Sequence, residues 1–592
     1  MEALNKEYSM KTVRFAMAFF WSATVLGAPL VAQESAPASP PALEGRARAE
    51  VVDAAQELFL DNITVNVVNV EVVVTDKKGQ PVRGLKVEDF ELFEDKRPME
   101  ISNFYAVDEG VPRGDVAAAQ PAPEDEGIPG LPLRTLGVPE DQRLNLIVFI
   151  DHFNIHALNR NRVMRDVRQF LVQNVKSEDR VMLMSYTRSL KVEQPFTSDP
   201  RLVSAALAGM EKNSGFANLR DSERREVLRN IDDAQGEASA FGYARSYAES
   251  VFNDLTFTIR ALKELVEQLA GLPGRKMVLH VSDGIPMVAG HEVFLYVDSK
   301  YTGSGVLNES FTYDASRQFQ QLVATANANR VTFYTLDAAG LRTSIFTDAS
   351  YEGSPGRGQL LDSAVIHNLQ DPLHMIANGT GGRAIVNRNR PLPALQEVAR
   401  DFRNFYSLGF SPSHAGTGRL YRIKVQLKEK SKRKAYRLRY RDSYRDKSVE
   451  TRMSDGTLAA LNFSYEANDH QVRLEFGSPR RQSEGKHYIV PIDIRIPLGN
   501  VTLVPVEGSY QGRVRLFIAA MDSDGGHSPV QEASVPISIP EKQLDPEGRQ
   551  QYVYSVELLM RNGGHEVAVG LRDDLAGETS FVRRRINVGA RG

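Results

Sequence analysis

Apolar residues run almost without a break through Arg143–Ile155 (RLNLIVFIDHFNI) until the run meets Asp151. Lys276–Val281 (KMVLHV) has the same pattern and leads into Asp283 and Gly284. Unbroken apolar runs of this length are typical of central strands in a parallel sheet that is covered on both faces. Because the carboxyl ends of parallel strands share one edge, we expect the two aspartates to lie together at the rim where open α/β sheets bind ligands.

Helical and strand-like segments alternate around these two runs. Further strands are predicted at Asp179–Tyr186, Leu190–Phe196, Val331–Leu336 and Arg383–Val386, and helices at Leu158–Val175, Val251–Leu269, Ala315–Ala328, Leu360–Gly379 and Leu392–Tyr406. The charged stretch Glu211–Ser250 is predicted to be a helical insertion. This alternation predicts an α/β domain with a doubly wound, mostly parallel sheet across residues 143–445.

Period-two patterns replace the helical ones on either side of that domain. Residues 58–108 alternate through TVNVVNVEVVVTD and are predicted to form a small β domain. Residues 109–142 are rich in Pro, Ala and acidic residues and are predicted to be a linker. Residues 450–592 contain short alternating strands separated by turns, which predicts an immunoglobulin-like β-sandwich.

The N-terminus has the features of an export signal. Lys11 and Arg14 precede Phe15–Ala32, a stretch of apolar and small residues. We interpret residues 1–32 as a cleaved signal peptide and residues 33–57 as a disordered leader; the alternative is a membrane anchor. No other stretch is long and apolar enough to span a membrane, so we expect an exported protein, periplasmic or extracellular, with no transmembrane segment in its mature form.

The amino-acid composition excludes several functional classes for this protein. The 592 residues include no cysteine, which excludes disulfides, thiolate zinc sites, cysteine catalysis and a lipidated cysteine. The net charge of −3 argues against a nucleic-acid partner. The sequence also contains no G-x-S-x-G motif, P-loop or Rossmann glycine fingerprint. We therefore expect a protein that is not an enzyme.

The two strand–aspartate motifs resemble the von Willebrand factor A (vWA) fold, in which D-x-S-x-S after the first strand and D-G after the fourth hold a divalent metal. The aspartates match at Asp151 and Asp283, whereas Phe153 and Ile155 stand where the family has serines. FYTLDAAGL, NGTGGRAI and FYSLGFSP are similar to segments of a bacterial, especially acidobacterial, family of vWA-related secreted proteins. That resemblance covers most of Ile63–Asp442.

The resemblance implies a degenerate metal site at the rim. Asp151 and Asp283 are the candidate ligands for Mg²⁺ or Ca²⁺, with Asn154 offering a carbonyl oxygen in place of a missing hydroxyl. The alternative is that the metal has been lost and the aspartates remain as cap residues of the turn. Phe153 and Ile155 are then candidates for an apolar, metal-independent contact with a partner.

A basic run follows the α/β pattern. Its members are Lys428, Lys430, Lys432, Arg433, Lys434, Arg437, Arg439 and Arg441. We interpret it as the solvated face of a hairpin; the alternative is a surface for an anionic polysaccharide or lipid headgroup.

Together these features predict an exported, non-enzymatic binding, adhesion or scaffold protein. Its vWA-like domain would bind a protein or another cell-envelope macromolecule at the carboxyl edge of the sheet, with a weak metal ion or none. The alternatives are an envelope hydrolase that uses Asp151 or Asp283 beside His152, and a structural spacer without a ligand. The sequence leaves the oligomeric state open.

Overall fold

A computed structural model describes residues 67–113, 143–212, 217–303, 305–342, 355–482, 487–543 and 550–589. The predicted signal peptide and leader, and nearly all of the predicted linker, lie outside these ranges. The chain divides into two compact units, one spanning Val65–Phe463 and the other containing Ser464–Gly592.

The first unit is built on a six-stranded sheet in the order β11-β10-β9-β6-β7-β8. Its strands are β6 (Leu144–Asp151), β7 (Arg180–Tyr186), β8 (Leu190–Thr197), β9 (Arg275–Ser282), β10 (Val331–Asp337) and β11 (Ala384–Ile385). All neighbours pair in parallel except β8, which runs antiparallel to β7. Every residue of β6 and β9 is buried, which confirms the central position that their apolar runs predict. The mixed α/β class with a mostly parallel sheet is confirmed.

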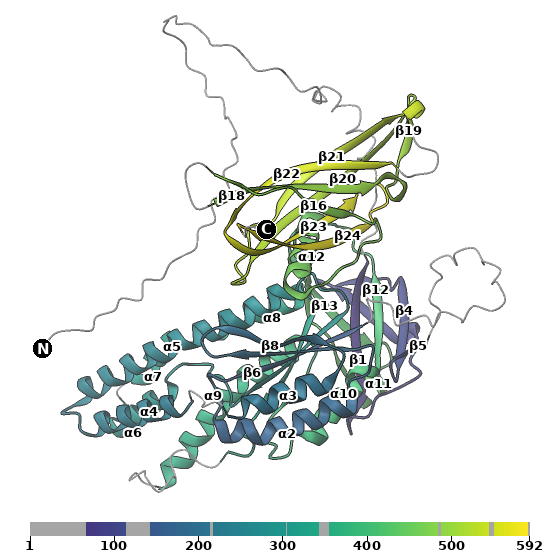
Figure 1. Ribbon diagram of the computed structural model, residues 1–592. Coiled ribbons are helices and arrows are strands. Elements are labelled where there is room, and N and C mark those ends of the chain that lie inside the picture. The colour runs from purple at the N-terminus through teal and green to yellow at the C-terminus, as the bar shows by residue number, and fades with distance from the viewer. Residues whose placement is uncertain are drawn as a thin grey trace, which may run out of the picture. The chain divides into compact units, whose positions relative to one another are not determined.

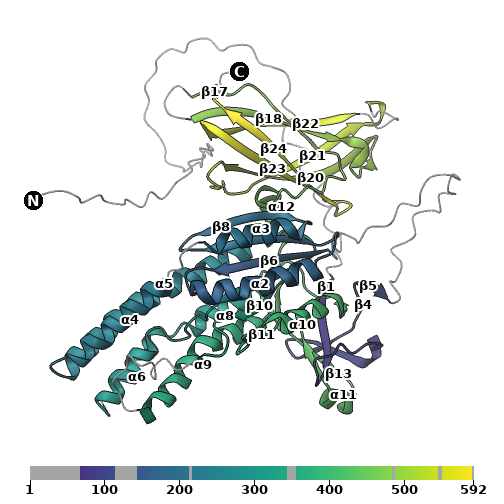
Figure 2. The ribbon, with the colours of Figure 1, turned by 60° about the horizontal axis from the view of Figure 1, so that its bottom comes forward.

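Helices cover both faces of this sheet (Figures 1 and 2). One face packs against α2 (Ala157–Asn174), α3 (Pro200–Met210) and α10 (Leu392–Arg403), whose apolar stripes join the strand side chains in one core. The opposite face is covered by α5 (Glu237–Gln268), α8 (Ser316–Ala328) and α9 (Pro355–Gly379). The chain places β7 and β8 on one side of β6 and β9 to β11 on the other, so the topological switch point lies between β6 and β9.

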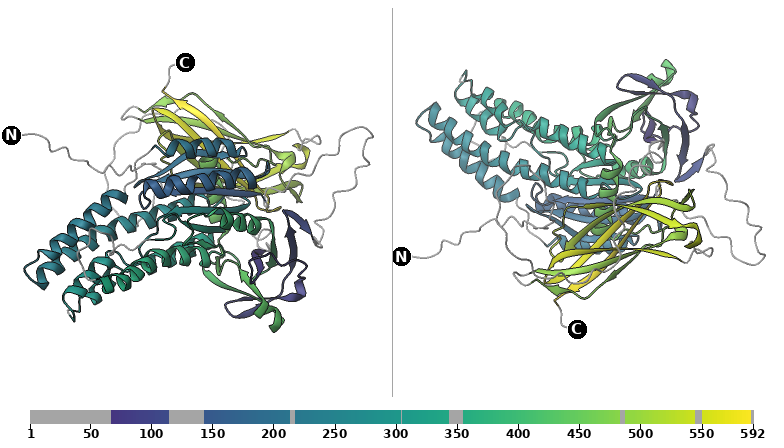
Figure 3. Two further views of the ribbon diagram at one scale, coloured as in Figure 1. Left: turned by 90° about the horizontal axis from the view of Figure 1, so that it is seen from below. Right: turned by 90° about the horizontal axis from the view of Figure 1, so that it is seen from above.

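The predicted insertion is helical. It consists of α4 (Ala217–Asp232) and the first half of α5, which pack together as a helix pair extending away from the sheet (Figure 3). The segment after Asp283 contains two further short helices, α6 (His291–Lys300) and α7 (Val306–Ser310). The insertion therefore adds a wall beside the carboxyl edge of the sheet.

The strands before and after the α/β core form one β subdomain, which differs from the predicted boundaries. Its two sheets have the orders β14-β1-β12-β4-β5 and β15-β13-β2-β3. Their strands are β1 (Val68–Asp76), β2 (Phe90–Glu94), β3 (Arg97–Met99), β4 (Asn103–Asp108), β5 (Val111–Arg113), β12 (Phe405–Phe410), β13 (Leu420–Leu427), β14 (Tyr436–Arg439) and β15 (Ser443–Arg445), with α11 (Lys430–Ala435) between β13 and β14.

Pairing between distant parts of the chain holds this subdomain together. Val70 pairs with Leu408 across β1 and β12, and Leu92 pairs with Val425 across β2 and β13. These side chains meet in a shared apolar core. The described part of the predicted small β domain, residues 67–108, therefore shares one core with residues 405–445, which do not belong to the α/β layer.

The second unit starts later than predicted, because α12 (Val449–Phe463) still belongs to the first. It contains two antiparallel sheets that enclose an apolar core. The strands are β16 (Arg473–Phe476), β17 (Arg480–Arg481), β18 (His487–Pro497), β19 (Val504–Val506), β20 (Ser509–Asp522), β21 (Gln531–Pro540), β22 (Gln551–Arg561), β23 (Gly563–Asp573) and β24 (Thr579–Val588). Its immunoglobulin-like topology stays a prediction.

Candidate functional site

The switch point brings the two aspartates to one rim. Ile150 pairs with Val281 in the parallel ladder between β6 and β9, so Asp151 ends one strand and Asp283 follows the other at the same edge. The backbone N–H of Asp283 donates a hydrogen bond of 2.9 Å to the carbonyl of Asn154, which joins the two turns directly. The predicted neighbourhood of Asp151 and Asp283 is confirmed.

Asp151 faces inward and holds its own turn. Its side chain is completely buried. Oδ1 accepts the backbone N–H of Asn154 at 3.1 Å, and Oδ2 accepts the side-chain amide of Asn154 at 2.8 Å. His280 lies 3.7 Å from the same carboxylate. A short polar side chain that closes a turn in this way gives buried donors an additional acceptor; the backbone N–H of Asn154 also lies 3.2 Å from the backbone carbonyl of Asp151.

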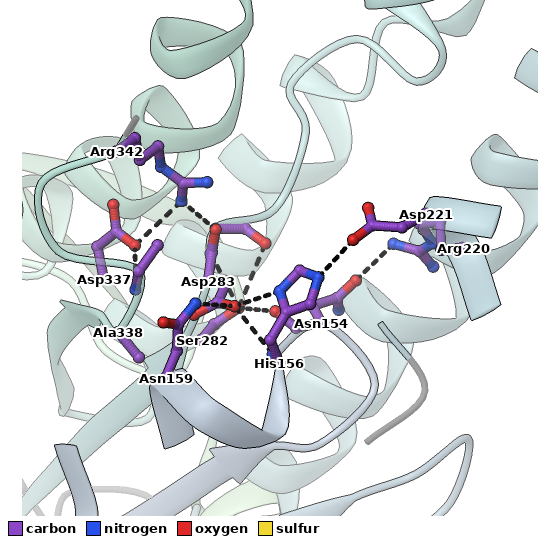
Figure 4. Close-up of polar contacts among 12 residues, drawn as sticks. Asn154, His156, Asn159, Arg220, Asp221, Ser282, Asp283, Asp337, Ala338 and Arg342 are labelled. Carbon is purple, nitrogen blue, oxygen red and sulfur yellow. Dashed lines mark hydrogen bonds and ion pairs between the residues drawn. The ribbon is translucent and has the colours of Figure 1, made fainter. Parts of the chain in front are cut away.

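The carboxylate of Asp283 is hydrogen-bonded to His156. Its Oδ2 accepts the backbone N–H of His156 at 2.9 Å, the ring Nδ1–H of His156 at 2.7 Å, and the side-chain amide of Asn159 at 2.9 Å. The other ring nitrogen of His156 lies 2.7 Å from Oδ2 of Asp221, at the start of α4 (Figure 4). The imidazole therefore bridges the strand end and the helical insertion.

His156 carries a positive charge at neutral pH. The hydrogen bond with Asp221, followed by the one with Asp283, raises its pKa to about 9. The pKa of Asp221 is lowered, because its contacts with His156 and Arg224 outweigh the opposing effect of burial. Both N–H groups of the imidazolium are thus committed to carboxylates.

Two arginines complete the network around the rim (Figure 4). Arg220 donates to the side-chain carbonyl of Asn154 at 2.7 Å, and its guanidinium lies 4.7 Å from the ring centre of Phe153. Arg342 donates to the backbone carbonyl of Asp283 and, at 3.0 Å, to Oδ1 of Asp337. Positive charge at this rim is therefore supplied by side chains of the protein itself.

The residues at the rim do not fit a magnesium or calcium ion in this arrangement. The carboxylate of Asp151 is buried against Asn154, and the amide oxygen of Asn154 already accepts from Arg220. Oδ2 of Asp283 accepts three N–H donors; only its Oδ1 lacks a hydrogen-bond partner in the described part of the chain. Within those residues no group of three or more His, Cys, Asp or Glu side chains is arranged to hold a metal ion.

Phe153 and Ile155 are not available as an exposed apolar contact. Ile155 is fully buried in the core beneath the sheet edge, and Phe153 is 5% exposed. The ring of Phe153 packs edge-on against Tyr186 and lies beneath Arg220. The prediction that Ile155 forms part of the partner surface is wrong, because an apolar residue in a turn next to a core gains more from burial than from exposure. Phe153 is nearly buried but lines the pocket beside the rim, so its predicted contact with a partner stays a prediction.

The hydrolase alternative requires His152 to act beside Asp151 or Asp283, and the position of His152 does not support this role. His152 is 3% exposed and contacts Arg160 at 3.0 Å instead of Asp283. Burial, assisted by the Arg160 charge, lowers its pKa to about 4. His156 lies beside Asp283 but is protonated, so neither ring nitrogen can accept a proton from a substrate at neutral pH.

A pocket of about 220 Å³ opens beside this network. Its walls combine the rim with the insertion, through residues such as Arg220, Arg224 and Tyr247, and with the segment after β9, through Glu292. The hydroxyl of Tyr247 donates to Glu292 at 3.3 Å. Arg220, Asp221 and Arg342 had no signal in the sequence, because they are 66, 65 and 59 positions away from the rim residues that they contact.

The fold and the site define a doubly wound α/β domain with a polar pocket at its switch point. In the described residues, no helix has both the length and the apolar character needed to cross a membrane.

No protein-family model matches the chain, and no curated protein matches it. Among solved structures, the chain is similar to an aerotolerance-related membrane protein from Bacteroides fragilis NCTC 9343, at 11% identity over 44% of this chain and 98% of that one, with a TM-score of 0.20. It is also similar to von Willebrand factor type A from Catenulispora acidiphila, at 10% identity over 76% of this chain and 66% of that one, with a TM-score of 0.20. At these TM-scores the likenesses carry no argument, and the fold class rests on the strand order.

Proposed function

We propose that the chain is an exported, non-enzymatic binding or scaffold protein whose α/β domain engages a macromolecular partner at the carboxyl edge of its sheet. One observation carries this proposal: the switch-point rim is closed by an imidazolium between two carboxylates from separate elements. Such a network fixes the shape of the adjoining pocket before a partner binds. A preformed site loses less conformational entropy on binding.

The proposed contact does not depend on a metal ion. In the vWA domains that the sequence resembles, a metal completes the rim; here His156, Arg220 and Arg342 supply positive charge in the same region. The same network supports a non-catalytic role, because its histidine donates from both nitrogens and has no lone pair left for base catalysis.

The binding proposal is tested with immobilised full-length protein and cell-envelope extract. We expect a reproducible set of bound proteins that persists in EDTA. Arg224→Ala, at the pocket wall, should reduce that set, whereas Arg317→Gln, an exposed arginine on α8 that does not line the pocket, should not. Binding that is abolished by EDTA, or that is equal in both variants, would contradict the proposal.

Export is tested separately. We expect mass spectrometry of the protein recovered from the producing cell to show a mature N-terminus just after Ala32. Recovery of the intact N-terminus with the cytoplasmic fraction would refute export without affecting the binding test.

A further inference from the structure

The opposite edge of the sheet contains a cavity of about 330 Å³ with an excess of positive charge. It lies at the amino ends of β9 and β10, against β1 and the segment around β15, entirely within the first unit. Its charged lining residues are Lys276, Arg330, Arg441, Arg445, Lys447, Arg452 and a single acid, Asp455. An adjoining cavity of about 40 Å³ shares Lys276, Arg330 and Arg441 and contains Glu71, which is paired with Arg275 at 2.7 Å.

The two innermost cations have only neutral partners. Lys276 is 5% exposed, and its ammonium donates to the backbone carbonyls of Ala270 at 3.1 Å and Leu272 at 2.9 Å. The guanidinium of Arg441 donates to the backbone carbonyls of Asn327 and Asn69, at 3.2 and 2.7 Å. In the described residues, no carboxylate forms an ion pair with either side chain. Carbonyl dipoles hold these charges in place but do not neutralise them.

Burial and neighbouring cations both disfavour the charged forms of these two groups. Burial, reinforced by Arg330 and Lys447, lowers the pKa of Lys276 well below its usual value. Burial, again reinforced by Arg330, lowers the pKa of Arg441 to about 9. Lys447 is the exception, because it pairs with Asp455 at 2.6 Å. Asp455 is the one acid among the lining residues of the larger cavity, and Glu71 in the adjoining cavity offsets part of the charge of Arg330 and Arg441, which leaves an excess of positive charge.

Arg330 and Arg452 stand at the exposed side of the cavity. Among the described residues, neither side chain has a hydrogen bond or ion pair. Arg330 follows α8 with a φ of 56°, a left-handed conformation in which glycine is usual after a helix. An arginine at this position costs more than glycine, and in the described residues its side chain makes no hydrogen bond or ion pair that offsets the cost. Its charge at the cavity offers a physical reason for the residue type.

We propose that this cavity binds a phosphate-class oxyanion, held by Arg330, Arg441 and Lys276. Guanidinium groups present forked donors that match tetrahedral oxyanions, and a lysine ammonium adds a point charge. A multivalent anion suits the charge excess better than a single carboxylate. The phosphoryl group can belong to free phosphate or to a phosphate ester, because the cavity has room for part of a larger molecule. This site lies at the edge opposite the proposed partner pocket and is independent of it.

The test measures calorimetric binding to the full-length protein. The titrants are sodium phosphate and glycerol 1-phosphate, with sodium acetate and sodium chloride at matched ionic strength as references. We expect saturable binding of both phosphate compounds and none of the references. Tighter binding of the ester would support the ester as the source, and tighter or equal binding of the free ion would support free phosphate. Heats identical to those of sodium chloride would overturn the proposal.

Variants separate a binding role from a structural one. Arg330→Gln should weaken phosphate binding roughly tenfold, the factor that corresponds to one charge-assisted hydrogen bond. In phosphate-free buffer at low salt, the same variant should raise the melting temperature, because it removes a repelling charge. Arg317→Gln removes an equal charge outside both cavities and should change neither quantity. A lower melting temperature with unchanged phosphate binding in Arg330→Gln would contradict the proposal.

Discussion

The two edges of the six-stranded sheet differ in how their charged side chains are paired. At the carboxyl edge, His156 lies between Asp283 and Asp221, and Arg342 contacts Asp337, so charges of both signs alternate in contact. At the amino edge, six cationic side chains share a cavity with one carboxylate. The first edge pairs most of its charges internally, whereas the second has an excess of positive charge that the proposed anion would balance. Substitutions that remove a charged side chain should therefore lower the free energy of unfolding at the carboxyl edge and raise it at the amino edge.

The largest expected effect is at Asp151. Asp151→Ala removes a buried carboxylate that accepts two N–H donors from Asn154, of which the backbone N–H keeps the Asp151 carbonyl, and should lower the free energy of unfolding by about 2–3 kcal/mol. Urea unfolding followed by circular dichroism measures the loss. Asp151→Asn keeps one acceptor oxygen and should lose about half as much. A loss below roughly 1 kcal/mol in the alanine variant would show that this turn does not depend on the carboxylate.

The second effect is a pH dependence that originates at His156. Its pKa is raised from 6.5 in the unfolded chain to about 9 in the folded protein, so its contribution is complete below pH 6.5 and is lost as pH rises through 9. Because the side chain is 35% exposed, solvent screening reduces the contribution to about 1–2 kcal/mol. Urea unfolding at a series of pH values measures it.

A matched variant isolates this contribution. His156→Gln keeps a hydrogen-bonding side chain but cannot titrate, so the difference in stability between wild type and variant should shrink as pH rises from 6.5 to 9. A difference that is constant over this range would mean that the bridge between Asp221 and Asp283 does not depend on the imidazolium.

The third effect is smaller and has the opposite sign. At low ionic strength without phosphate, Arg330→Gln should raise the free energy of unfolding by roughly 0.5 kcal/mol, because an exposed like-charge contact is removed. The gain should disappear in high salt, where screening already weakens the repulsion. Thermal melts at two salt concentrations provide the measurement. A gain that persists in high salt would point to a cause other than repulsion among the cavity cations.

The smallest expected effect is that of divalent metals. Because the rim oxygens already accept N–H donors, titration with Mg²⁺, Ca²⁺ or Mn²⁺ should give no saturable heat. A saturable signal that disappears in Asp283→Asn would restore the metal site that the sequence resemblance implies, with the free Oδ1 of Asp283 as its anchor.

Sequence pattern alone was sufficient for the layers of the α/β domain. The apolar runs of β6 and β9 are long enough to require burial on both faces, and parallel pairing then places Asp151 and Asp283 at one edge. The helices that cover the sheet followed largely from their apolar stripes, whereas the short α6 and α7 were not predicted. These features are local, because the period of apolar residues reports which side of an element avoids water.

Only the tertiary structure decided which distant segments meet and where each side chain points. The pairing of β1 with β12 joins residues more than 300 positions apart, and many partners share the same alternating pattern. His156 gained its partner Asp221 from the predicted helical insertion, whose contact with the rim has no sequence signal, and Ile155 turned into the core. Arg441, predicted in a solvated basic run, lies in the amino-edge cavity instead. Local periodicity determines burial, but charge pairing depends on distances that arise only when the chain has folded.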